Sequence, residues 1–147
     1  MGLDQNLEGE KYIGGQYKHN NVKGVIYSGE EPIYAKDLCS VTYALGDWRK
    51  ANSIHKWFVD NIQDGEDDCG RYLVQRELLH ELKAICVEIL NAENVEDLVL
   101  EKLPPQAGFF FGSTDIDEEY MNKIEHTVEI IDKALEFDGD IYYSSSW

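Results

Sequence analysis

The segment DWRKANSIHKWFVDNIQ, residues 47–63, constrains the fold of this chain more than any other segment. Its bulky side chains recur at steps of three and four residues, which is the spacing of a buried helical face. The residues of this face are Trp48, Ala51, His55, Phe58 and Ile62. Further apolar residues widen the face almost around the helix, so neighbouring elements should cover it on both flanks. We therefore expect a central aromatic helix over residues 47–63, with Asp47 as its N-cap.

Short antiparallel strands are expected in residues 11–43, where Tyr, Ile and Val cluster between turn residues. The segments KYI and QYK flank Gly14-Gly15 and predict a first hairpin. The segments KGVIYS and PIYAKD flank the turn residues GEEP, 29–32, and predict a second hairpin. The N-terminal part of the chain is therefore expected to be rich in β-structure.

Three further helices are expected after the central one. A second helix has the core-face residues Leu78, Leu82, Ile85 and Ile89. Asn94 and Asp97 form a capping signal for a short third helix. Thr114 and Asp117 supply a capping box for a final helix over about 117–137, which shows apolar residues at helical spacing.

The whole chain, residues 1–147, is expected to form a single globular domain of the α+β class. Its β-rich part covers residues 11–43, its mainly helical part residues 47–137, and its C-terminal tail residues 141–147. N-terminal short antiparallel strands would be followed by three or four helices that pack around the central aromatic helix. A chain of this length buries about two thirds of its unfolded surface, so it can build a sizeable core.

The net charge of −16 is unevenly distributed along the chain. Residues 1–60 hold seven Lys or Arg against eight Asp or Glu, a net charge of −1. Residues 61–147 hold six Lys or Arg against twenty-one Asp or Glu, a net charge of −15. Direct binding to nucleic acid is disfavoured, because contacts to phosphates need a cationic surface. An acidic field suits solubility, or docking onto a basic partner protein.

Signals for disulfides, metals and membranes are weak. Cys39, Cys69 and Cys86 form no C-x-x-C pair and have no histidines at zinc spacing, so neither a disulfide framework nor a structural zinc is expected. The acidic segment 64–70 lacks the alternating ligands of an EF-hand. No run approaches the roughly 18 apolar residues of a membrane span. We expect a cytoplasmic protein without a metal, a cofactor or a membrane partner.

No sequence motif predicts a catalytic residue. The segment 108–114, GFFFGST, resembles a phosphate-binding loop only superficially, because three residues separate its glycines and it has no lysine. The nucleophile motif G-x-S-x-G is absent. His55 has Arg49, Asn52 and Lys56 within about two helical turns, but a satisfied core histidine is the simpler interpretation. An enzyme is therefore the less expected class.

Two aromatic blocks and a cationic stripe together suggest a site for a nucleotide-like ligand. Such a ligand needs rings that stack, an Arg fork for phosphate, and neutral polar groups for base or ribose edges. The predicted ligand-binding residues are Trp48, Arg49, Asn52, His55, Phe110, Phe111, Tyr142, Tyr143 and Trp147. The hypothesis requires that the two blocks converge in space.

The acidic residues of the C-terminal part suggest a second kind of site, a surface for a basic partner protein. Its predicted residues are Asp64, Glu66, Asp67, Asp68, Asp115, Asp117, Glu118 and Glu119. Binding through such a surface would weaken strongly as salt screens the charges.

Four segments of the chain resemble a family of small, acidic, uncharacterised proteins of bacteriophages and bacteria. The segments are MGLD, WRKANSIHKWFVDNIQDGEDDCG, PPQAGFFFGSTDID and YYSSSW, and together they cover about a third of the chain. The resemblance implies a setting, that of a phage accessory protein acting in the host cytoplasm, where such proteins often block host immunity. It implies no mechanism.

Three functions follow as hypotheses. The first is a non-enzymatic counter-defence inhibitor that binds and sequesters a nucleotide-like immune signal. The second is an acidic protein that mimics nucleic acid and, like an anti-CRISPR protein, blocks a host nuclease or another basic surface. The third is a small hydrolase or transferase that uses His55. The partner would thus be a nucleotide-like small molecule or a basic host defence protein, and a homo-oligomer is possible.

Overall fold

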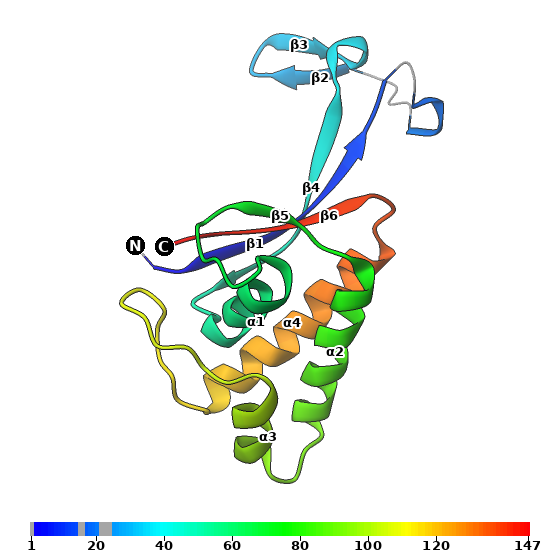
Figure 1. The fold of residues 1–147 in the computed structure, drawn as a ribbon. Coiled ribbons are helices and arrows are strands. Elements are labelled where there is room, and N and C mark those ends of the chain that lie inside the picture. Colours follow the sequence, from blue (N-terminus) through cyan, green and yellow to red (C-terminus); the bar gives the residue numbers. More distant parts are fainter. Residues whose placement is uncertain (1, 15–16, 21–24) are drawn as a thin grey trace.

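The computed structural model describes residues 2–14, 17–20 and 25–147 (Figure 1). It has the mixed α+β architecture that the sequence predicts. Its main sheet consists of four antiparallel strands, β1 (Asp4–Tyr12), β4 (Ser40–Arg49), β5 (Arg71–Leu73) and β6 (Asp140–Ser146). Their order across the sheet is β4-β1-β6-β5. Strands from opposite ends of the sequence, β1 and β6, therefore lie side by side in its middle.

Four α-helices lie on one side of this sheet (Figure 1). They are α1 (Asn52–Ile62), α2 (Arg76–Leu90), α3 (Val95–Lys102) and α4 (Glu118–Glu136). Because side chains alternate along a strand, every second residue of β6 is buried, and the same holds for β1 as far as Gly9. No helix in the described ranges is both long and apolar enough to cross a membrane.

Strands β1 and β4 continue beyond the four-stranded sheet as a two-stranded ribbon. Strand β6 pairs with β1 only as far as Glu10, whereas β4 pairs with β1 up to Tyr12. A separate two-stranded sheet of β2 (Val25–Ser28) and β3 (Glu31–Tyr34) lies at the far end of this ribbon (Figure 1). We refer to the described residues between 11 and 43 as the arm. The arm projects away from the helices.

The core lies between the sheet and the helices and is centred on α1 and β6. Phe58 of α1 stacks flat on Tyr143 of β6, with ring centroids 4.0 Å apart and planes 8° apart. Trp48 and Trp57 pack against Phe58 at centroid distances of 6.0 and 5.3 Å. Burying each such side chain contributes about 1.5–3 kcal/mol. The predicted aromatic helix is therefore confirmed as the central element of the fold.

The start of this helix differs from the prediction. Helix α1 begins at Asn52, and Trp48 belongs to strand β4. Asp47 therefore caps no helix, and the N-cap position is Ala51, which makes no side-chain capping bond. Lys50 has a φ of 54°, which ends the strand and turns the chain. Buried side chains before and after this turn pack into the same core. Their spacing in the sequence equals that of a helical face, and for this reason the predicted helix began too early.

The predicted end of the helix is confirmed. Helix α1 ends at Ile62, and Asp64 and Gly65 follow with φ angles of 53° and 81°. The Gly65 N–H donates to the Val59 carbonyl at 2.9 Å, which satisfies one of the free carbonyls at the helix end. Glycine suits this position because it has no Cβ to oppose a positive φ.

Of the two predicted hairpins, the second is confirmed. Strands β2 and β3 pair around Gly29-Glu30, and Gly29 has a φ of 64°. A glycine with positive φ at the first turn position suits the twist of a hairpin. The first predicted hairpin is wrong in its described part, because Lys18–Asn20 is a 3-10 turn and the KYI segment lies at the end of the long strand β1. Residues 15–16 of that hairpin lie outside the described residues.

The helix caps follow local sequence signals. Asn94 caps α3 by accepting a hydrogen bond from the Asp97 N–H at 3.4 Å, as predicted. Asp117 caps α4 by accepting from the Tyr120 N–H at 3.0 Å. Asp117 is thus the N-cap itself, and Thr114 does not hold that position. The shift moves the start of α4 by three residues relative to a capping box that opens at Thr114.

The second helix has a rotated core face, and the tail has an unexpected form. The buried residues of α2 are Leu79, Leu82, Cys86 and Ile89. Leu78 and Ile85 of the predicted face are only half-buried, because α2 packs beside α4. The predicted tail 141–147 forms strand β6 and thus completes the main sheet. The strand starts at Asp140.

Gly46 of β4 sets how closely α4 approaches the sheet. A Cβ atom at this position would lie 2.5 Å from Cγ1 of Ile130. We predict that Gly46→Ala lowers the free energy of unfolding by about 1–3 kcal/mol through overpacking, as urea unfolding would measure. In an Ile130→Ala background the same change should cost less, because the smaller side chain leaves room. An equal cost in both backgrounds would contradict the steric explanation.

Candidate functional site

His55 is completely buried where α1, β6 and the loop after α1 meet. Its Nδ1 lies 2.7 Å from the Tyr143 hydroxyl oxygen, and its Nε2 lies 2.9 Å from Oδ2 of Asp67. The Phe111 ring stands edge-on to the imidazole with centroids 5.4 Å apart. Both ring nitrogens thus have partners, as a buried polar group requires.

A neutral imidazole with its proton on Nε2 satisfies both contacts, and we assign this tautomer. Nε2–H then donates to Asp67, while the Tyr143 hydroxyl donates to Nδ1 of His55. This order of groups resembles a proton relay. The Tyr143 side chain is completely buried, however, and burial raises the pKa of its hydroxyl far above the ordinary value. The network therefore serves to fix β6 and the loop against α1.

The two predicted aromatic blocks converge around His55. The rings of Phe111 and Trp147 meet edge-on with centroids 6.0 Å apart, and the ring centroids of Trp48 and Tyr143 lie 6.5 Å apart. We refer to these five residues as the His55 cluster. It is a packed region, because Trp48 is 3% exposed and Phe111 7% exposed, whereas Trp147 is 48% exposed. Only the Trp147 face of the cluster is accessible to a ligand.

Asn52, another predicted ligand-binding residue, is occupied by the chain itself. Its Nδ2 donates to the carbonyls of Phe111 and Ser113 at 3.0 and 2.9 Å. Its Oδ1 accepts from the Gln106 N–H at 2.9 Å. The buried amide of Asn52 thus pins the glycine- and phenylalanine-rich loop to the first turn of α1.

Three predicted ligand-binding residues lie outside the cluster. Arg49 is exposed and pairs with Asp4 at 3.5 Å. Phe110 is half-buried in the turn that precedes the cluster. Tyr142 alternates with the buried residues of β6 and therefore faces away from the helices, and the Arg71 guanidinium lies 3.7 Å from its ring centroid. The predicted phosphate ligand Arg49 is thus separate from the rings.

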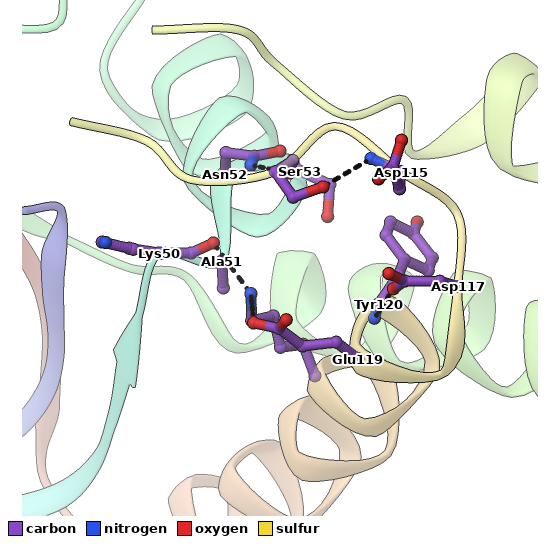
Figure 2. Close-up of a pocket in the computed structure, with 10 residues that line it drawn as sticks. Lys50, Ala51, Asn52, Ser53, Asp115, Asp117, Glu119 and Tyr120 are labelled. Carbon is purple, nitrogen blue, oxygen red and sulfur yellow. Dashed lines mark hydrogen bonds and ion pairs between the residues drawn. The ribbon is translucent and has the colours of Figure 1, made fainter. Parts of the chain in front are cut away.

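A small pocket lies at the N-termini of α1 and α4 (Figure 2). Its volume of about 10 Å³ is the space of a single water molecule. Lys123 lines this pocket and donates through Nζ to the Lys50 carbonyl at 3.2 Å and to Oε1 of Glu119 at 2.9 Å. Among the described residues, no group of three or more His, Cys, Asp or Glu side chains is placed to hold a metal ion.

The predicted acidic surface is exposed except at one residue. Twenty of the twenty-one Asp and Glu residues in 61–147 are exposed. The exception is the half-buried Asp67, which holds His55 and accepts from Nε1 of Trp147 at 3.1 Å. The other predicted residues, Asp64, Glu66, Asp68, Asp115, Asp117, Glu118 and Glu119, are exposed. Among them, Asp68 accepts a hydrogen bond from the Tyr72 hydroxyl, which lowers the pKa of its carboxyl.

A row of carboxylates lies along α4, and the sequence prediction included only its first residue, Glu118. It consists of Glu118, Glu125, Glu129, Asp132 and Glu136, and we refer to it as the acidic stripe. Steps of seven, four, three and four residues place these side chains on one side of the helix, where all are exposed. Among the described residues, Asp132 of the stripe pairs with Lys83, and Oε2 of Glu129 lies 3.7 Å from Nδ1 of His126. The signal in the sequence that could have predicted the stripe is the helical spacing of these acids.

The basic side chains of α4 point to the edge of the sheet instead. Lys123 donates to the carbonyl of Lys50, His126 to that of Asp47 and Lys133 to that of Ala44, at 3.2, 2.9 and 3.1 Å. Because β4 is an edge strand of the main sheet, its outward carbonyls have no strand to pair with. Helix α4 thus directs its basic side chains to backbone carbonyls of β4 and the turn after it, and Lys123 also pairs with Glu119. Among the described residues, three of the five acids of the stripe, Glu118, Glu125 and Glu136, have no ion pair.

Comparison of this chain with protein-family models, with curated proteins and with solved structures finds no match. The two regions described above differ in access. The His55 cluster is packed, and the acidic stripe faces solvent.

The buried Tyr143 makes stability sensitive to high pH. Burial raises its pKa, so the folded state keeps this proton above pH 10.0, where the unfolded chain releases it. The contribution of Tyr143 to stability should be complete below that pH and should fall by about 1.4 kcal/mol per pH unit above it. Cys86, whose pKa burial raises to about 12, adds to the loss from pH 9.0. Urea unfolding across this range should show a shallower fall for Tyr143→Phe, and an unchanged slope would contradict the assignment.

Proposed function

We propose that this protein is a non-enzymatic inhibitor that blocks a basic, nucleic-acid-binding surface of a host protein by presenting carboxylates in place of phosphates. The observation that carries the proposal is the acidic stripe of α4, whose helix turns all its basic side chains to the edge of β4. The stripe is therefore accessible and keeps most of its negative charge.

The dimensions of the stripe suit such a role. From Glu118 to Glu136 it extends over about 27 Å, at 1.5 Å per residue. One DNA strand presents about eight phosphates over this length, since they follow at 3.4 Å along the axis. The stripe is less dense in charge than DNA, so the remaining acids of residues 61–147 contribute through the long-range field. Such a field speeds the encounter with a basic groove.

The resemblance of residues 48–70 and 104–117 to small phage proteins supports a counter-defence setting. The target in that setting is a nuclease or another nucleic-acid-binding defence protein of the host. Occupying its groove requires a stable acidic surface and no catalytic group. The predicted acids at positions 64–68 and 115–119 add exposed negative charge, and Glu118 among them belongs to the stripe itself.

Removal of charge from the stripe tests this function. We expect the variant Glu125→Gln/Glu129→Gln/Glu136→Gln to weaken binding to the target by about tenfold or more, because a carboxylate that meets a cation loses its charge. The matched control is Glu93→Gln/Glu96→Gln/Glu101→Gln, which removes three exposed charges at α3.

The measurement has two steps. Immobilised protein captures basic proteins from a bacterial lysate, and each captured protein is purified and loaded with a fluorescent DNA duplex. The wild-type chain and the control variant should displace the duplex. Their affinity for the target should fall steeply between about 50 and 200 mM salt, because added salt shortens the Debye length and screens the charges. Failure to compete with the duplex, or an equal loss in both variants, refutes the proposal.

Sequestration of a nucleotide-like immune signal is the second candidate, and the convergence of rings at the His55 cluster favours it. Trp147 is the accessible ring, and it covers Phe111 from the side. Displacement of its indole would uncover a stacking surface for a base. The cluster has to open for this, so the second candidate ranks below the first. A hydrolase using His55 has the least support, because its ring is buried and both nitrogens are engaged.

Calorimetric titration with ATP and with cyclic di- and trinucleotides tests the second candidate. If a base stacks where the indole is displaced, Trp147→Ala should strengthen binding, because the cost of displacing the ring is removed while base stacking still contributes about 1–3 kcal/mol. Trp57→Phe is the control, because Trp57 is buried and is not a member of the cluster. The absence of binding heat with every one of these nucleotides removes this candidate and leaves the first untouched.

A further inference from the structure

The hairpin of the arm carries large apolar side chains that are at least half exposed in the described part of the chain. Val25, Ile26, Tyr27 and Tyr34 are 50%, 51%, 66% and 51% exposed. All four residues of β2 are exposed. An isolated two-stranded hairpin is marginally stable in water, and three or more strands are needed for independent stability. Within the described ranges the hairpin has only these two strands, so a third strand would stabilise it.

The outer edge of β3 is protected against further pairing. Ser28 and Glu31 flank the two-residue turn and form a hydrogen-bonded pair, so the next pair, Tyr27 with Pro32, is a non-hydrogen-bonded one. In such a pair the backbone N–H and C=O groups point outward. Pro32 has no N–H, and Glu31 adds a charge, and both features block strand addition at this edge.

The outer edge of β2 has no such protection. By the same alternation, Val25 and Tyr27 direct their backbone N–H and C=O groups away from β3. The strand VIYS contains no charge and no proline. Within the described residues, β3 is the only strand that pairs with it. An uncharged apolar edge of this kind is a template for pairing with another chain.

We propose that β2 is a self-association surface, at which β2 of one copy pairs antiparallel with β2 of a second copy. The result is a four-stranded sheet in the order β3-β2-β2-β3. Antiparallel pairing of two identical strands places a twofold axis between them, so the assembly closes as a dimer. This interface is separate from the acidic stripe and does not depend on the proposed function.

The charge distribution favours a second copy as the occupant. Residues 11–43 hold four Lys against three Asp or Glu, a net charge of +1, although the whole chain carries −16. Two copies that met through their helices would repel each other, whereas two arms meet almost without net charge. Because the arm projects away from the helices, the two acidic bodies stay apart in the dimer (Figure 1).

Light scattering coupled to size exclusion tests the proposal on the full chain. One chain has a mass of 16.9 kDa, and we expect the measured mass to be twice that value. The protein concentration should be about 100 μM, well above the dissociation constant of a micromolar dimer. Val25→Lys should give the monomer, because it places a charge on the edge strand of each copy, and a charged edge opposes pairing with another chain. The matched control is Tyr34→Lys, which stands opposite Val25 in the hairpin, is equally exposed and lies on the same face, yet belongs to β3. It should remain a dimer.

Each other outcome overturns the proposal. A monomeric wild type means that β2 does not bind a second copy, and loss of the dimer in both variants indicates contact through the hairpin face. A dimer in both variants places the interface elsewhere. Unchanged thermal unfolding of the variants, followed by circular dichroism, shows that the core is intact. Added salt should strengthen this dimer by screening the repulsion between bodies, whereas it weakens binding to a basic target.

Discussion

The stack of Phe58 on Tyr143, together with the hydrogen bond between Tyr143 and His55, is the contact on which the rest of the structure depends. It joins the central helix α1 to β6, which in turn holds β1 on one side and β5 on the other. Asp67 binds the far side of the His55 ring and fastens the loop after α1 to Trp147. A buried polar group that loses its partner costs about 1–3 kcal/mol, so loss of one of these residues destabilises the contacts of the others.

The features that sequence could predict are those with local causes. The α+β class, the hairpin at Gly29 and the end of α1 at Gly65 follow from apolar periods and turn chemistry within a few residues. The start of α1 was misplaced because Trp48 lies in a strand whose buried positions continue into the helix. The length and central place of β1 were missed because it pairs with β6 from the other end of the sequence. Pairing at that separation leaves no local signal.

The candidate site divides in the same way. Aromatic density around His55 was visible in the sequence, and the rings do meet, but their burial depends on packing between α1, β6 and the loop at Phe111. The acids of α4 were visible too. That Glu118, Glu125 and Glu136 have no ion pair among the described residues depends on the edge position of β4, because the carbonyls of this strand and of the turn after it accept from Lys123 and Lys133. The solvent access of the His55 cluster and the charge balance of the acidic stripe both depend on tertiary packing. They determine which of these two sites we favour.

The pairing of β1 with β6 also determines when the protein can fold. During synthesis, residues 140–146 follow α1 and β5, so until they leave the ribosome β5 has no strand to pair with and Phe58 does not have the Tyr143 ring to stack on. A nascent chain therefore holds exposed aromatic side chains for most of its translation. Contacts of such long sequence separation also form slowly. The acidic charge of residues 61–147 keeps the waiting chains apart by mutual repulsion, which protects them from aggregation before the sheet is complete.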